Sequence, residues 1–166
     1  ELFDGLNNFP SEDIPMTEIK KHTISENKDI KKYAFEVYAA FGDSPELMLS
    51  PLENNELPVR SAIITGLLKR NSIEHITTGG EFLFKMLNDN NTKIEGLEIV
   101  GNIRNDSFYR PIIKAFTDKN KEVVKTAIRV ASKINNQKLI PHLVHFLHDK
   151  EQGRGAMTAL AVYEND

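Results

Sequence analysis

The sequence predicts an all-α fold of about five helical hairpins that stack in register. A twelve-residue pattern recurs at 30–41, 59–70, 92–103, 123–134 and 152–163, and successive copies start 29, 33, 31 and 29 residues apart. A second amphipathic segment precedes each of the last four copies. No segment alternates apolar and polar residues as a half-buried strand would. Self-similarity at a period of about 30 residues is the signature of a helical repeat array.

The recurring pattern places apolar residues along one stripe of a helix in each copy. The fifth position is mostly small, and the sixth is always large and apolar. Small residues let neighbouring helices approach closely, and large residues fill the space between layers. The third, seventh and eleventh positions are mostly polar, so we expect one exposed strip on each of these second helices. The fifth-position residues are Ala34, Ile63, Gly96, Ala127 and Ala156, and the sixth-position residues are Phe35, Ile64, Leu97, Ile128 and Met157.

The first helix of each hairpin is expected at 44–53, 80–88, 107–117 and 137–148. Short polar turns such as "DKNKE" and "DKEQG" join it to the second helix. Asp118 and Asp149 stand in these turns, where a carboxylate can accept hydrogen bonds from the free N–H groups of the next helix. Pro58 directly precedes the apolar pattern, which suits the start of a helix.

At these columns the chain resembles HEAT-like repeats, especially the short bacterial kind. The resemblance is carried by "PVRSAIITGLLKR", "GLEIVGNI" and "DKNKEVVKTAIRVASKI", and it extends from about Ile30 to Tyr163. It implies a right-handed α-α superhelix, an armadillo-type α-solenoid. We therefore expect a repeat domain over 26–166 and a linker or cap over 1–25. The chain departs from the pattern at three positions, which are Thr92 and Gln152 at the first and Arg70 at the twelfth.

The composition excludes several kinds of site. The chain has no cysteine, which rules out disulfides, thiolate metal sites and a cysteine nucleophile. It also lacks the glycine-rich phosphate loops, the esterase motif and the zinc-protease motif. No run of about 18 apolar residues exists. We expect no enzymatic activity and no cofactor.

The basic residues concentrate late in the sequence. Residues 1–91 carry 9 Lys and Arg against 15 Asp and Glu, whereas residues 92–166 carry 12 against 9. Lys125, Arg129 and Lys133 are four apart and share a helix face, and Arg110 and Lys114 come from the preceding helix. These five side chains are the candidate partner-binding site, suited to an acidic protein segment, a phosphate or an anionic lipid head group.

The alternative interpretation of this basic cluster is a solvated helix face, because basic faces are common on soluble helices. Glu98 occupies the same column as Arg129 in the adjacent repeat, so a surface ion pair is expected to neutralise part of the charge.

His142, His145 and His148 stand three residues apart, and Asp149 directly follows the last of them. Imidazoles and a carboxylate on one helix face can hold zinc. The steps drift around the helix, however, and the intervening Leu143, Val144, Phe146 and Leu147 have the character of the core stripe. We therefore expect outward-facing histidines and no metal.

The predicted function is that of a non-catalytic protein-interaction or scaffold module. The second helices of a curved stack line one side, so their polar strips form a concave surface that suits an extended or convex partner. We expect a protein partner in the cytoplasm and no nucleic acid, because the whole chain is acidic and has no Trp.

The resemblance leaves other functions open. Short HEAT-like arrays occur attached to bacterial major-facilitator or nucleotide-translocase-like transporters. The first residue is not Met, so a cytoplasmic regulatory segment of such a protein, at the inner face of a membrane, is the main alternative. HEAT-like bilin lyases and alkylpurine DNA glycosylases are less favoured, because no lyase residue can be nominated and the expected groove is mixed in charge.

Overall fold

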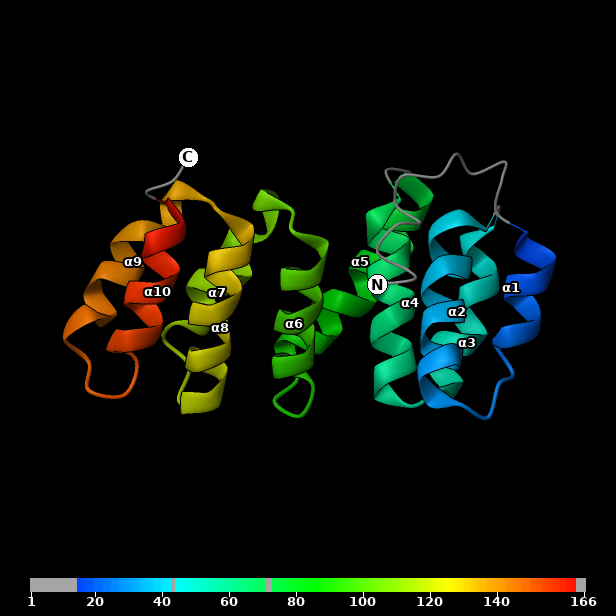
Figure 1. Cartoon of the computed structure of the whole chain (residues 1–166), viewed down its shortest axis with the longest axis horizontal. Helices are drawn as coiled ribbons and strands as arrows, with labels where there is room; N and C mark the ends of the chain where they lie inside the picture. Colours follow the sequence, from blue (N-terminus) through cyan, green and yellow to red (C-terminus); the bar gives the residue numbers. More distant parts are fainter. Residues whose placement is uncertain (1–14, 43, 71–72, 164–166) are drawn as a thin grey trace. The chain divides into compact units, whose positions relative to one another are not determined.

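All regular elements of the described residues are helices, which confirms the predicted all-α class. The structure is a computed structural model that describes residues 15–42, 44–70 and 73–163. No strand occurs in these ranges. The helices are α1 Met16–His22, α2 Lys28–Phe41, α3 Leu49–Asn54, α4 Leu57–Lys69, α5 Ile73–Asn88, α6 Lys93–Ile103, α7 Tyr109–Ala115, α8 Lys121–Ile134, α9 Ile140–His145 and α10 Gly153–Tyr163 (Figure 1).

The second helices α2, α4, α6, α8 and α10 coincide with the five predicted copies of the pattern. Three of the first helices, α3, α7 and α9, are shorter and begin or end in 3₁₀ turns, at Pro45–Met48 before α3, Asp106–Phe108 before α7, and Gln137–Leu139 and Phe146–His148 around α9. The helix expected at 80–88 is longer than predicted, because α5 continues back through Gly79 to Ile73. A Cβ on Gly79 would lie 3.0 Å from the Cβ of Leu67 on α4, so the glycine permits this close approach.

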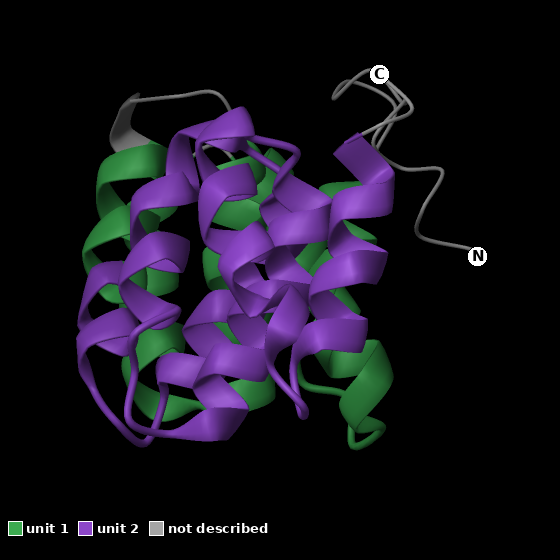
Figure 2. Ribbon diagram, turned by 90° about the vertical axis from the view of Figure 1, so that its left-hand side faces the viewer, with its two compact units in different colours: residues 1–83 green, residues 84–166 purple. Residues whose placement is uncertain are grey.

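The chain divides into two compact units, residues 1–83 and 84–166 (Figure 2). In the first unit, α1 packs on α2, α2 packs on α4, and α3 packs on α4. In the second unit, α6, α8 and α10 pack on one another in chain order, while α7 packs on α8 and α9 on α10. The predicted linker or cap over 1–25 contains α1, and its residues 1–14 lie outside the described residues. None of the helices described is long and apolar enough to cross a bilayer.

The core follows the predicted columns with one exception. All five fifth-position residues are buried, and so are four of the sixth-position residues. Met157, the last of them, is 61% exposed, so its predicted place in the core is wrong. The reason lies in the contact between α8 and α10, where a Cβ on Gly155 would lie 3.5 Å from Cγ2 of Ile128. A sixth-position side chain therefore packs against the fourth position of the next second helix, and no described helix follows α10.

The prediction of an exposed polar strip is also wrong for one helix, α4. Ser61 and Thr65 of α4 were expected to be exposed, and both are buried. Helix α4 packs against both α2 and α3, which covers more than one stripe. The hydroxyl groups donate within the helix, from Ser61 to the carbonyl oxygen of Leu57 (2.9 Å) and from Thr65 to that of Ser61 (2.8 Å), so their burial leaves no donor unsatisfied.

Side-chain hydrogen bonds cap some of the helix starts, such as those of α2 and α8. Asp149 Oδ1 accepts hydrogen bonds from the backbone N–H groups of Glu151 and Gln152, as predicted. Among the backbone N–H groups described, Asp118 accepts only that of Asn120, and it is Asn120 that caps α8. Pro58 stands in the first turn of α4, as expected.

We expect opposite effects of alanine at two glycines of the first unit. A Cβ on Gly66 would lie 2.2 Å from the carbonyl oxygen of Glu36, so Gly66→Ala must push α4 away from the α2 backbone and lower the free energy of unfolding by about 3 kcal/mol. Gly80→Ala meets nothing within 4 Å inside α5 and should raise it by about 0.5–1 kcal/mol. Urea unfolding followed by circular dichroism measures both, and equal effects of the two variants would contradict the packing described.

Candidate functional site

Three of the predicted basic residues lie on the outer face of α8. Asn120 begins this helix, and the side chains of Val124, Ile128 and Ala131 face the core. Lys125 and Arg129 are exposed on the opposite side, and Lys133 is half-buried in the last turn. The periodicity of the sequence therefore places these three side chains together, as predicted.

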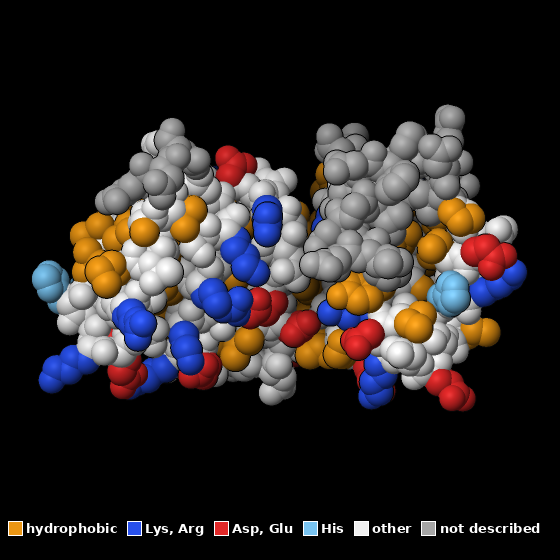
Figure 3. All heavy atoms as spheres, in the orientation of Figure 1, with side chains coloured by type: hydrophobic (Ala, Val, Ile, Leu, Met, Phe, Trp, Pro, Cys, Tyr) orange, Lys and Arg blue, Asp and Glu red, His pale blue; other side chains and the backbone are white. Residues whose placement is uncertain are grey.

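Acidic neighbours neutralise two of these three cations. Arg129 pairs with Glu98 of α6, which confirms the ion pair expected from the shared column. Lys125 Nζ lies 3.7 Å from Glu122 Oε2, one turn earlier in α8. Figure 3 shows Lys and Arg side chains interleaved with Asp and Glu on the face that α6 and α8 present. The α8 strip is therefore less positive than its sequence alone indicates.

Lys133 has a different environment. Its Cδ would lie 3.2 Å from a Cβ on Gly101, so the aliphatic part of the side chain packs over α6. Burial, followed by the nearby charges of Arg129 and Arg104, lowers the pKa of Lys133. An anion bound here would stabilise the ammonium form and oppose that shift.

Arg110 and Lys114 lie elsewhere, on α7. Lys114 Nζ donates to Asn88 Oδ1 at the end of α5 (2.9 Å), and Arg110 Nε donates to the Tyr109 hydroxyl oxygen (3.2 Å). Neither cation has an acidic partner within ion-pair distance among the residues described. The five predicted residues thus form two groups, three on α8 beside α6 and two on α7 toward the end of α5.

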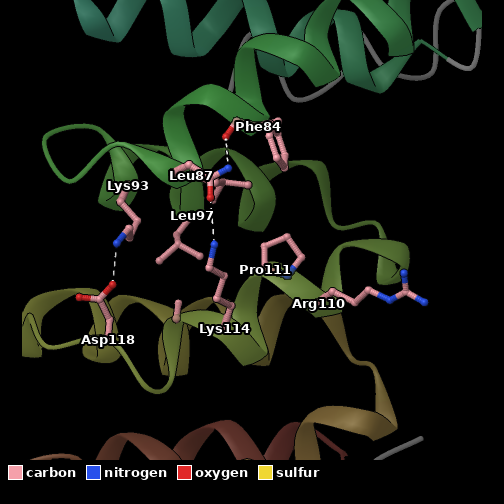
Figure 4. Close-up of a pocket in the computed structure, with 10 residues that line it drawn as sticks. Phe84, Leu87, Lys93, Leu97, Arg110, Pro111, Lys114 and Asp118 are labelled. Atoms are coloured by element: carbon pink, nitrogen blue, oxygen red, sulfur yellow. Dashed lines mark hydrogen bonds and ion pairs between the residues drawn. The ribbon is translucent and has the colours of Figure 1, made fainter.

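The two α7 cations line a pocket of the second unit, here called the α5–α7 pocket. It encloses about 320 Å³ and is mainly apolar (Figure 4). Its lining comes from the end of α5, from α6 and from α7. The lining residues are Phe84, Leu87, Asn88, Lys93, Leu97, Arg110, Pro111, Lys114, Ala115 and Asp118.

An ion pair closes the other end of this pocket. Lys93 Nζ lies 2.7 Å from Asp118 Oδ2, and the two side chains are only 17% and 18% exposed. The hydrogen bond from Lys93, together with the backbone N–H of Asn120, lowers the pKa of the Asp118 carboxyl group. Sequence reasoning gave Asp118 a capping role and did not find this pair.

The pair belongs to a series that the sequence does signal. Three of the second helices begin with a lysine. The ammonium group of this lysine forms an ion pair with an acidic residue in the turn before the next second helix. The pairs are Lys28–Glu56, Lys93–Asp118 and Lys121–Glu151. Their spacing of 25 to 30 residues matches the repeat.

The histidines face outward. His142, His145 and His148 are exposed, and no group of three potential metal ligands occurs among the residues described. The expectation that their neighbours form the core is wrong in part. Leu143 is buried, but Val144 and Leu147 are 48% and 39% exposed, because no described helix packs on that side of α9.

Comparison with known proteins matches one family. A family model for HEAT repeats matches residues 80–162, a range that covers nearly all of the second unit. No curated protein matches the chain.

The Lys93–Asp118 pair is expected to stabilise the fold. Asp118→Asn keeps the hydrogen bond from Asn120 but loses the charge, and should lower the free energy of unfolding by about 1 kcal/mol at pH 7. Because folding lowers the pKa of Asp118 below its ordinary 3.8, the stabilisation is present above that pH and lost as the pH falls through the folded pKa. Urea unfolding at pH 7 and pH 3 should show the difference between variant and wild type shrinking.

The matched control for this prediction is Glu151→Gln. Its pair with Lys121 has side chains 75% and 59% exposed, so its loss should destabilise the fold less than Asp118→Asn does. A control variant as destabilised as Asp118→Asn would contradict the assignment.

Proposed function

The chain belongs to the HEAT repeat family, and we propose that it is a protein-interaction module that binds an acidic segment of a partner without catalysing a reaction. Members of this family generally act as scaffolds for protein interactions. The proposal for this chain adds where the partner binds, which is at the cations Arg110, Lys114 and Lys133 of the second unit, unpaired in the described part of the chain.

The observation that carries the proposal is that three of the five predicted cations have no acidic partner among the residues described. Arg110, Lys114 and Lys133 all lie in the second unit, and none has an ion pair among the residues described. Lys125 and Arg129 are paired instead. A carboxylate of a partner gains the most binding free energy at cations that are not already paired with an acid.

The chemistry of the site favours protein over nucleic acid. Duplex binding rests on many phosphate contacts, and affinity depends on how many cations neutralise them. In the second unit Glu98, Glu122 and Asp118 lie among the cations and would repel a phosphate backbone. A short acidic peptide segment can select the free cations and avoid these acids. The concave face of a solenoid and the attachment to a membrane transporter remain predictions.

A labelled acidic peptide tests this function. Fluorescein-labelled decaglutamate, titrated at low salt, should bind the wild type and lose affinity about tenfold with Arg110→Glu plus Lys114→Glu, which is about 1.4 kcal/mol. Lys125→Glu plus Arg129→Glu should have a smaller effect, because both side chains already have acidic partners. Raising the salt concentration should weaken binding.

The control pair for this titration lies in the first unit. Lys20→Glu plus Lys31→Glu changes the net charge by the same amount, and decaglutamate affinity should change little. An equal loss with the control pair would mean that only net charge matters, and the proposed site would be rejected. Circular dichroism of each variant verifies that it is folded.

A further inference from the structure

We propose that the α5–α7 pocket binds one apolar side chain of a partner peptide, of leucine or phenylalanine size, while Arg110 and Lys114 hold an adjacent carboxylate. This inference rests on the proposed function and names the peptide class that the site would select. It adds an apolar anchor to what is otherwise a charge interaction.

The floor of the pocket is suited to an apolar side chain. Leu87, Leu97, Pro111 and Ala115 supply it, and Leu97 is fully buried beneath. A volume of about 320 Å³ with a mainly apolar lining lies in the range of sites that hold small ligands. An apolar group that enters leaves water and contacts these side chains.

An exposed aromatic ring stands at the rim. Phe84 is 70% exposed, the second most exposed of the large apolar residues described. The rim is held by two hydrogen bonds, from Asn88 Nδ2 to the Phe84 carbonyl oxygen (2.8 Å) and from Lys114 Nζ to Asn88 Oδ1 (2.9 Å) (Figure 4). Such a ring can cover a bound side chain, and binding would remove it from water.

The charges around the pocket give the peptide a direction. Arg110 and Lys114 are one turn apart on α7 and have no acidic partner in the part of the chain described. At the opposite end Asp118 is held by Lys93, and its carboxylate would repel another acid (Figure 4). The acidic residue of the peptide should therefore lie at the Arg110 end, with the apolar residue between the two ends.

A second depression favours an extended peptide over a single small molecule. It encloses about 580 Å³, is more polar, and shares Lys93, Lys114 and Asp118 with the α5–α7 pocket. Thr117, Lys119 and Asn120 add polar groups to its lining. Backbone N–H and C=O groups of a peptide need such partners, whereas the acyl chain of a fatty acid does not.

Selection from a random dodecapeptide phage library tests the inference. The library is panned on the full chain and depleted on the variant with Arg110→Glu and Lys114→Glu, and the enriched peptides are synthesised. We expect a leucine, isoleucine or phenylalanine next to an aspartate or glutamate. Enriched peptides without this pair, or no enrichment over the depletion variant, would overturn the inference.

Titration of the enriched peptides by fluorescence polarisation gives the second measurement. Replacing the apolar peptide residue with alanine should weaken binding at least tenfold. Phe84→Ala should weaken it about fivefold, whereas Ile76→Ala, the matched control at another exposed position of α5, should not. Equal losses for Phe84→Ala and Ile76→Ala, or competition by dodecanoate stronger than by the peptides, would exclude the apolar peptide anchor.

Decaglutamate separates the failure of this inference from the failure of the proposed function. Phe84→Ala should leave decaglutamate binding unchanged, because decaglutamate has no apolar residue to insert. If decaglutamate responds to Arg110→Glu plus Lys114→Glu but no apolar peptide is enriched, the proposed function stands and the pocket has no such role. If neither probe responds to this pair, both are wrong.

Discussion

Close contact between successive second helices is the constraint on which the rest of the structure depends. A glycine marks each contact that the structure describes within a unit. Gly66 brings α4 against the backbone of α2, Gly101 lies under Val130 and Lys133 of α8, and Gly155 faces Ile128 from α10. The three glycines occupy different positions of the pattern. Different combinations of large and small residues therefore produce the close contacts between successive second helices.

This spacing also decides which charges are available for binding. Second helices held side by side bring their polar strips within reach, so Arg129 meets Glu98 of the same column, and Lys69 of the eleventh column meets Glu36 of the seventh. Part of these polar strips, which the sequence alone would assign to a binding surface, therefore pairs with the neighbouring second helix. Among the described residues Lys114 has no acidic partner, because the neighbouring α5 offers it only the side-chain amide of Asn88. Ion pairs between neighbouring second helices contribute little to stability when exposed, but they reduce the charge that is available to a partner.

Most of the fold could be predicted because the residue pattern of the second helices repeats. The predictions of burial and exposure failed where the repeat ends or changes. The columns located all five second helices, but a column cannot tell that no described helix covers Met157. It likewise treats α4 like any other second helix, although α4 contacts both α2 and α3 and buries Ser61 and Thr65. The basic residues were found from their spacing. Their division between α7 and α8 depends on which helix each faces, which the sequence does not state.

The α5–α7 pocket lies where the repeat departs most from its period. The longest spacing, 33 residues, separates the copies that start at 59 and 92. The added length lies in α5, which has 16 residues, whereas α7 has 7. Thr92 replaces the usual apolar first residue, and its hydroxyl donates to the carbonyl oxygen of Met86 (3.1 Å), which closes the turn between α5 and α6. A strictly regular array buries its stripes evenly between neighbours. An irregular repeat leaves a pocket and an uncovered ring such as Phe84, so the proposed binding site in this chain lies at a departure from the pattern.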